Sequence, residues 1–95
     1  MYARVARWEG SNAEALRSMS EMINSAEKPP DGVPSNGIIV LNDLEEGRSL
    51  VIGLFDTEAD LRTGDEVLRG MDRPEGSAGD VSSVEFYEVA VDRRM

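Results

Sequence analysis

The stretch 49-SLVIGLF-55 decides the fold of this chain, because it is apolar at nearly every position. A strand with one face open to water alternates apolar and polar residues, whereas a strand covered on both faces does not. We therefore predict that residues 49–55 form a central strand of a sheet that is covered on both sides.

Three further segments have the pattern of strands. The segment Tyr2–Glu9 alternates with period two and ends at Gly10. Residues 38–42, IIVLN, are a short apolar run between Gly37 and the polar loop DLEEG. Residues 81–91, VSSVEFYEVAV, alternate again. Together with residues 49–55 they predict a sheet of four strands.

A first helix is predicted after Gly10, where Ser11 and Glu14 have the spacing of a capping box. Pro29 and Pro30 stop this helix, and the residues up to Gly37 are typical of turns. Its expected buried stripe consists of Leu16, Met19, Met22, Ile23 and Ala26.

A second helix is predicted to begin after Thr57, which forms a capping pair with Asp60. Gly64 falls within its apolar stripe, although a glycine inside a helix costs roughly 1 kcal/mol relative to alanine. We expect either a close approach to the sheet or space for another group at that point. The expected stripe is Leu61, Gly64, Val67, Leu68 and Met71.

The predicted order is β-α-β-β-α-β, which is the ferredoxin-like arrangement of one α+β domain spanning residues 1–95. In this arrangement two helices cover one face of a four-stranded antiparallel sheet, and strands one and three lie in the middle. The other face is bare. Because the strands are apolar on both faces, we expect a second copy to cover the bare face in a two-fold homodimer.

The composition excludes several classes of function. The 95 residues include 19 acidic and 10 basic side chains, and the formal net charge of −9 disfavours nucleic acid and membrane surfaces as partners. There is no cysteine and no histidine, which removes disulfides, thiolate nucleophiles, the commonest general base and the commonest metal ligand. Without a targeting or membrane-spanning pattern, we expect a cytoplasmic protein that carries no cofactor and no metal.

Three segments carry a resemblance to a known family: MYARVARWEGS at the start, GRSLVIGLFDTEADL in the middle and VSSVEFYEVAV near the end. They resemble the dimeric α+β barrel superfamily, in particular its antibiotic biosynthesis monooxygenase-like domains, many of them small uncharacterised actinobacterial proteins. The resemblance covers nearly the whole chain. It implies a homodimeric barrel, but the family mixes cofactor-independent monooxygenases, haem-degrading enzymes, isomerase-like members and stress-responsive proteins.

The resemblance also implies a site. In haem-degrading relatives a polar residue of the first strand, counted back from the glycine that ends the strand, faces the cleft between sheet and helices. That count falls on Arg4, where those relatives have Asn. Tyr2 and Trp8 share the face of Arg4. Ala3 and Val5 then point into the barrel of the dimer, although the pattern alone leaves the two faces interchangeable.

Two departures from the family make haem breakdown an unlikely activity on sequence grounds alone. Haem-degrading members have a Trp on the second helix, three positions after an anchor residue. With Leu61 as the anchor, that position is Gly64. They also use a His as the iron ligand, and this chain has none. A His-assisted monooxygenase lacks its proton acceptor for the same reason.

The remaining catalytic hypothesis assigns roles to three residues. Arg4 holds a phenolate or enolate by charge-assisted hydrogen bonds, while Trp8 and Tyr87 flank an aromatic ring. The alternative is structural for each of them. Trp8 and Tyr87 then serve packing, and Arg4 forms an ion pair with Glu85 or Glu88 of a neighbouring strand.

Other polar residues are predicted to be structural. Asn12, Asn36 and Asn42 lie beside predicted helix or strand ends, where Asn caps or turns the chain. The acidic group Asp72, Glu75 and Asp80 lacks the ligand spacing of a calcium loop and is expected to form a solvated loop.

Two functions are therefore compatible with the sequence. The first is a cofactor-independent oxidation or isomerisation of a small aromatic or polyketide-like molecule near Arg4 and Trp8. The second is a non-catalytic dimeric domain that binds a small hydrophobic or aromatic ligand, assembles, or belongs to a stress response. The absence of histidine favours the second.

Overall fold

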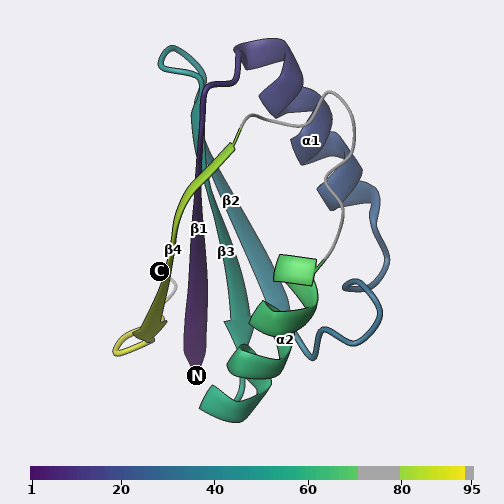
Figure 1. Ribbon diagram of the computed structural model, residues 1–95, viewed down its shortest axis with the longest axis vertical. Coiled ribbons are helices and arrows are strands. Elements are labelled where there is room, and N and C mark those ends of the chain that lie inside the picture. The colour runs from purple at the N-terminus through teal and green to yellow at the C-terminus, as the bar shows by residue number, and fades with distance from the viewer. Residues whose placement is uncertain (71–79, 94–95) are drawn as a thin grey trace.

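The computed structural model describes residues 1–70 and 80–93, which form four strands and two helices (Figure 1). The strands make one antiparallel sheet in the order β2-β3-β1-β4. This confirms the predicted ferredoxin-like arrangement, with the first and third strands in the centre. The elements are β1 (Tyr2–Glu9), α1 (Ala13–Ser25), β2 (Gly37–Asp43), β3 (Arg48–Phe55), α2 (Glu58–Gly70) and β4 (Asp80–Glu88).

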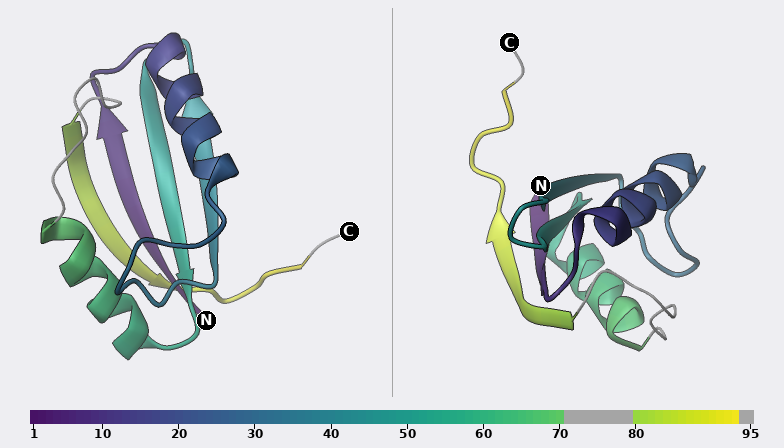
Figure 2. Two further views of the ribbon diagram at one scale, coloured as in Figure 1. Left: turned by 90° about the vertical axis from the view of Figure 1, so that its right-hand side faces the viewer. Right: turned by 90° about the horizontal axis from the view of Figure 1, so that it is seen from above.

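Both helices lie on one side of the sheet (Figures 1 and 2). The register decides which residues face them, because residues opposite each other in neighbouring strands share a face. Arg4 lies opposite Gly53 of β3 and Phe86 of β4, and its guanidinium contacts Asp65 of α2. Even-numbered residues of β1 up to Trp8 therefore face the helices. Odd-numbered residues up to Arg7 lie on the opposite face, which we call the open face.

The main core lies between β3 and α2. Phe55 and Leu61 are almost completely buried there, and Val33 packs against them. Val33 belongs to the segment between α1 and β2, which the sequence predicted only as a turn. Its peptide N–H donates to the carbonyl of Pro30, which folds this segment back over the core. A loop residue therefore completes the hydrophobic cluster.

Gly64 marks the closest approach between α2 and the sheet. A Cβ atom at this position would lie 2.6 Å from Cε1 of the Phe55 ring, which is far inside van der Waals contact. Of the two sequence-based explanations, close approach to the sheet is therefore correct, and the aromatic ring of Phe55 occupies the space. This glycine is required because the helix backbone itself forms the wall of the core.

The start of α1 differs from the prediction. Asn12, rather than Ser11, is the N-cap, and its side chain accepts a hydrogen bond from the peptide N–H of Ala15. The peptide N–H of Ser11 donates to the carbonyl of Gly47, so Ser11 belongs to the turn before the helix. The Thr57 cap of α2 is confirmed, because its hydroxyl accepts from the peptide N–H of Asp60.

The buried stripe of α1 is narrower than predicted. Leu16 is fully buried, but Met22 is 63% exposed and Ala26 lies just after the helix. The cause is helical geometry: at 3.6 residues per turn, Met22 lies about 120° around the helix from Leu16, whereas Ile23 lies about 20° away. The sequence-based assignment of Met22 to the core is therefore wrong.

Strand β4 ends at Glu88, three residues before the predicted end at Val91. Its only strand partner among the described residues is β1, which begins at Tyr2, directly opposite Glu88. The last link is a hydrogen bond from the peptide N–H of Val89 to the carbonyl of Met1. Residues 89–93 follow β4 and pair with no strand among the described residues.

Each of the two helices has 13 residues, and in the described part of the chain no helix has the length and apolar character needed to cross a membrane. Met71 of the predicted stripe, together with Asp72 and Glu75 of the acidic group, lies outside the described residues.

We predict that Gly64→Ala destabilises the protein, although alanine is the better helix former. The new methyl group would overlap the buried Phe55 ring, and overpacking of this kind costs about 1–3 kcal/mol. Gly70→Ala in the same helix is the control, because its Cβ would meet nothing within 4 Å, and we expect unchanged or slightly higher stability. Urea unfolding of both variants measures this. Equal midpoints would contradict the packing assignment.

Candidate functional site

The side of the sheet that faces the helices carries an ion-pair cluster of three residues. Nε of Arg4 donates to Oδ1 of Asp65 at 2.8 Å, and Nε of Arg69 donates to both carboxylate oxygens of Asp65 at 2.9 and 2.8 Å. The side chains of Arg4 and Asp65 are only 11% and 15% exposed, whereas that of Arg69 is 57% exposed. Two guanidinium groups thus share one carboxylate, and the cluster keeps a net positive charge.

The pKa of Asp65 reflects this arrangement. Partial burial acts to raise the pKa of the carboxyl group, but the hydrogen bonds and charges of Arg4 and Arg69 outweigh burial and lower it below the ordinary value of 3.8. Asp65 is therefore ionised at neutral pH and is not a proton donor. Arg4 does form an ion pair, as the structural alternative predicted, but its partner is Asp65 and not Glu85 or Glu88.

The structure does not bring the three predicted catalytic residues together. Trp8 shares the face of Arg4 but lies four residues along β1, a separation of about 13 Å at the rise of a strand. Tyr87 lies opposite Ala3, so it is on the open face, away from Arg4 and Trp8. Trp8 and Tyr87 consequently cannot flank one aromatic ring held by Arg4 within a single chain.

The phenol of Tyr87 is held in its protonated form. Its hydroxyl donates to Oε2 of Glu85 at 2.6 Å, and this hydrogen bond, together with the negative charge of Glu85, raises the pKa of Tyr87 above 10.0. Tyr87 is therefore a poor proton acceptor.

A hollow of about 190 Å³ opens between α2 and the edge strand β4, next to the ion-pair cluster. Tyr2 and Phe86 supply aromatic surface to it, and Leu61 forms its inner wall. Phe86 lies directly opposite Arg4 in the register, so the aromatic surface and the positive cluster are neighbours. The complete lining is Tyr2, Glu58, Leu61, Arg62, Phe86, Tyr87 and Glu88.

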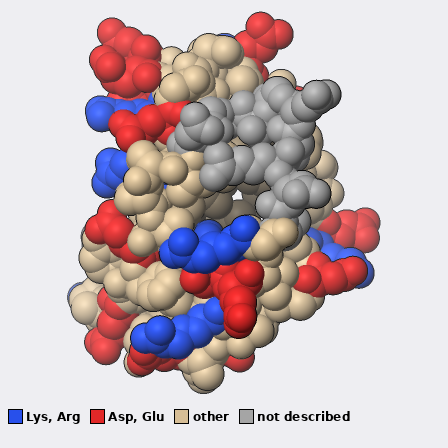
Figure 3. Space-filling model, viewed as in Figure 1, with Lys and Arg blue, Asp and Glu red and all other residues tan. Residues whose placement is uncertain are grey.

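Charged side chains surround this region without forming a surface of one sign. On the face seen in Figure 3, basic and acidic groups are interleaved around α2. One such pair is Arg62 with Glu58, at 2.8 Å, on the exposed side of the helix.

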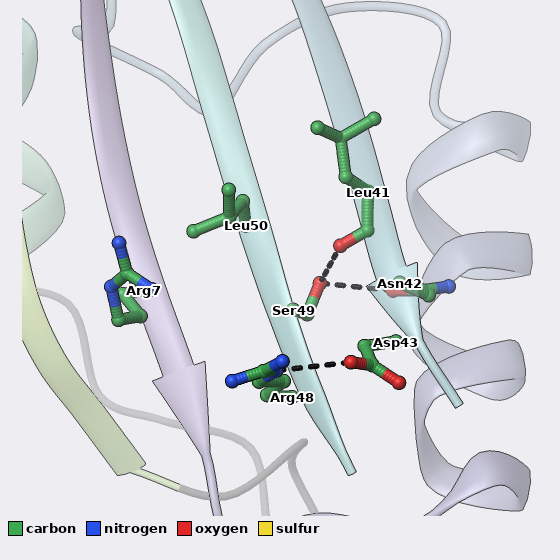
Figure 4. A pocket seen from close by; sticks show the side chains of 7 residues that line it. All are labelled: Arg7, Leu41, Asn42, Asp43, Arg48, Ser49 and Leu50. Carbon is green, nitrogen blue, oxygen red and sulfur yellow. Dashed lines mark hydrogen bonds and ion pairs between the residues drawn. The ribbon is translucent and has the colours of Figure 1, made fainter. Parts of the chain in front are cut away.

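A second hollow, of about 320 Å³, lies at the other end of the sheet (Figure 4). Arg48 forms an ion pair with Asp43 at 3.0 Å across one side of it. The hydroxyl of Ser49 lies 3.0 Å from the carbonyl of Leu41 and 2.9 Å from Oδ1 of Asn42. Its lining is Arg7, Leu41, Asn42, Asp43, Arg48, Ser49 and Leu50, so most of its polar groups already bind one another.

Of the three Asn residues predicted to cap or turn the chain, Asn12 forms a helix cap, whereas the side chains of Asn36 and Asn42 bind residues of other segments. Asn36 donates from Nδ2 to Oδ1 of Asp56, next to the end of β3. Asn42 joins two elements, because its amide donates to the hydroxyl of Ser20 in α1 while its oxygen lies 2.9 Å from the hydroxyl of Ser49 in β3.

The open face carries a group of neighbouring apolar side chains. Leu41 and Ile39 of the edge strand are exposed, and the central strands add half-buried side chains to the same face. Arg7, Asp43, Arg48 and Glu85 lie around the margin, which gives an apolar centre and a polar rim. The apolar residues are Val5, Ile39, Leu41, Leu50, Ile52 and Leu54.

Asp65 and Phe86 are the site residues that the sequence-based reasoning missed. The signal for Asp65 was its position four residues after Leu61, which places a carboxylate on the inner side of the helix. Phe86 could have been found from the alternation of the last strand, which assigned it to the opposite face from Tyr87. In the described residues no group of three or more acidic side chains could hold a metal ion.

Comparison of the chain with protein-family models, with curated proteins and with solved structures gives no match.

We predict that Asp65→Asn lowers the free energy of unfolding by about 1–3 kcal/mol at pH 7, because it leaves the partly buried Arg4 without its counter-charge. The folded-state pKa of Asp65 is depressed, so the stabilisation is present above pH 3.8 and disappears as the pH falls through the folded-state value. The difference between wild type and variant should accordingly shrink below about pH 4.

Glu58→Gln is the matched control in the same helix. It removes an exposed pair with Arg62, and we expect a loss below about 1 kcal/mol. Urea unfolding at pH 7 and at a series of acidic pH values measures both variants. A loss that is equal for the two variants, or independent of pH, would contradict the role assigned to Asp65.

Proposed function

We propose that this chain is a non-catalytic α+β barrel domain that works as a homodimer, with the open faces of two sheets packed against each other. The apolar open face is the observation that supports this proposal. An antiparallel sheet that faces water on one side carries polar residues there, whereas this face has Leu50, Ile52 and Leu54 in its central strand. A second copy of the chain presents the same surface and is self-complementary by symmetry.

The size of the chain supports the same proposal. A domain of 95 residues buries only about 60–65% of its unfolded surface when it folds alone. In this chain the described residues with less than 2% exposure and a large side chain are Phe55, Leu16 and Leu61. If a second copy covered the Leu, Ile and Val side chains of the open face, the domain would bury more apolar surface than it does alone.

The interior contacts support a non-catalytic role. Phe55 fills the space beside Gly64, and Arg4 is bound to Asp65 rather than directed into an open cavity. The chain has no histidine, and the carboxylate of Asp65 is already bound by Arg4 and Arg69, so neither provides a free proton acceptor beside Arg4. The aromatic hollow at Tyr2 and Phe86 is then a place for a small hydrophobic or aromatic ligand, bound without being transformed.

We predict that Leu41→Asp weakens the homodimer at least about 30-fold, because it buries a charge in the apolar interface. Ile38→Asp is the matched control: both side chains belong to β2 and are 51% exposed, but Ile38 points to the helix side. Sedimentation equilibrium of the wild type and both variants gives the three dissociation constants. A monomeric wild type, or equal effects of the two substitutions, would overturn the proposal.

One observation favours a second function, a cofactor-independent monooxygenase acting on a small aromatic molecule. The aromatic hollow lies next to a cluster with net positive charge, and Phe86 and Arg4 are neighbours across the sheet. Such a cluster would hold a phenolate beside the ring-binding surface. The substrate carbanion would supply all the electrons: a CH2 group and O2 would give a carbonyl group and water.

Oxygen uptake with a panel of phenolic and hydroquinone substrates tests this second function. If it holds, the wild type consumes oxygen, and Arg4→Ala and Phe86→Ala each lower kcat/KM by at least about tenfold, since each removes a substrate contact. Arg17→Ala, an exposed change on α1, should leave turnover unaltered. No oxygen uptake by the wild type over the whole panel would rule the second function out.

A further inference from the structure

Residues 89–93, which we call the C-terminal arm, leave the body of the molecule after the end of β4. The arm projects beyond the rest of the chain in both views of Figure 2, and in Figure 1 it lies on the side of the sheet away from the helices. Its first residue is still held, because the peptide N–H of Val89 donates to the carbonyl of Met1. The arm therefore starts at a fixed point and extends on the side of the open face.

The first three residues of the arm are apolar, and the charged residues Asp92 and Arg93 follow them. The arm begins Val89, Ala90, Val91, and Val91 is 78% exposed. The alternation of the preceding strand continues into it, which is why the sequence predicted a strand up to Val91. No strand of the described residues pairs with Val91, and its side chain stays exposed.

We propose that the arm of each chain docks on the open face of a second copy, where Val91 covers the exposed side chains of the partner's β2. This inference rests on the homodimer proposed above and adds a specific contact to it. Face-to-face packing covers the central strands best and leaves edge strands at the margin. Leu41 and Ile39 are the exposed apolar residues of that edge on the open face, and Val91 is an apolar group of matching character at the end of an extended arm.

Disulfide trapping tests the contact directly, because the chain contains no cysteine of its own. Val91→Cys and Leu41→Cys are prepared as separate single variants, mixed in equal amounts and oxidised. Any disulfide between the two positions must then join two chains. Such a bond requires the two Cα atoms to approach within about 7 Å, so it reports close contact. Val91→Cys mixed with Ile38→Cys is the control, since Ile38 is equally exposed on the other side of β2.

The expected result is a disulfide between positions 91 and 41, identified by peptide mass spectrometry, that forms at least tenfold faster than the bond between positions 91 and 38. If the wild type is dimeric but the two Cys variants form no bond between positions 91 and 41, or form both bonds at equal rates, the arm contact is wrong and the homodimer stands. A monomeric wild type in sedimentation equilibrium would overturn both proposals, so the two failures are distinguishable.

Removal of residues 89–95 provides a second measurement. The shortened chain keeps every strand and helix of the described fold, and its circular dichroism should match the wild type. We expect its dimer dissociation constant to rise about tenfold, which is the value of burying one valine side chain. An unchanged dissociation constant would overturn the proposed docking of the arm.

Discussion

The packing of Phe55 against the backbone of Gly64 is the contact on which the rest of the structure depends. Because residue 64 has no side chain, α2 comes close enough to the sheet for the Phe55 ring to fill the core completely. The same close approach places Asp65, the next residue of the helix, 2.8 Å from Arg4 of the central strand. A larger residue at position 64 would move the helix outward, and both the core and the ion pair would change.

The close approach of α2 at Gly64 also limits the space on the helix side of the sheet. The sequence-based prediction compared Gly64 with a Trp of haem-degrading proteins and left open whether space for another group remains there. Here the ring that occupies this space comes from the sheet, as Phe55, and it is part of the core. The adjacent Arg4 is bound to a carboxylate that remains charged at neutral pH. The hollow on this side of the molecule lies instead at the edge of the sheet, at Tyr2 and Phe86.

The two faces of the sheet differ in how their apolar side chains are covered. The helix side is closed by Phe55, Leu61 and Val33 and by one ion-pair cluster. The open side carries the aliphatic side chains of Val5, Ile39, Leu41, Leu50, Ile52 and Leu54, and no helix or strand of the described residues covers them. Our proposals for the homodimer and for the C-terminal arm both cover the open face. Such cover is favourable because a surface of Leu, Ile and Val in contact with water costs free energy in proportion to its area.

Period-two and period-3.6 patterns record which side of each element is buried, so the sequence predicted the order of elements, and the ferredoxin-like arrangement then gave the strand order. The sequence did not show that Arg4 and Tyr87 lie on opposite faces, which follows from the register. Only the tertiary structure decided that Asn12 caps α1, that Val33 joins the core, that Met22 is exposed and that Asp65 is the partner of Arg4. The packing of Val33 and the pairing of Asp65 with Arg4 depend on contacts between segments far apart in the chain, whereas the cap at Asn12 and the exposure of Met22 are local features of α1. Local periodicity identifies the buried side of a segment but not the residue that will lie against it.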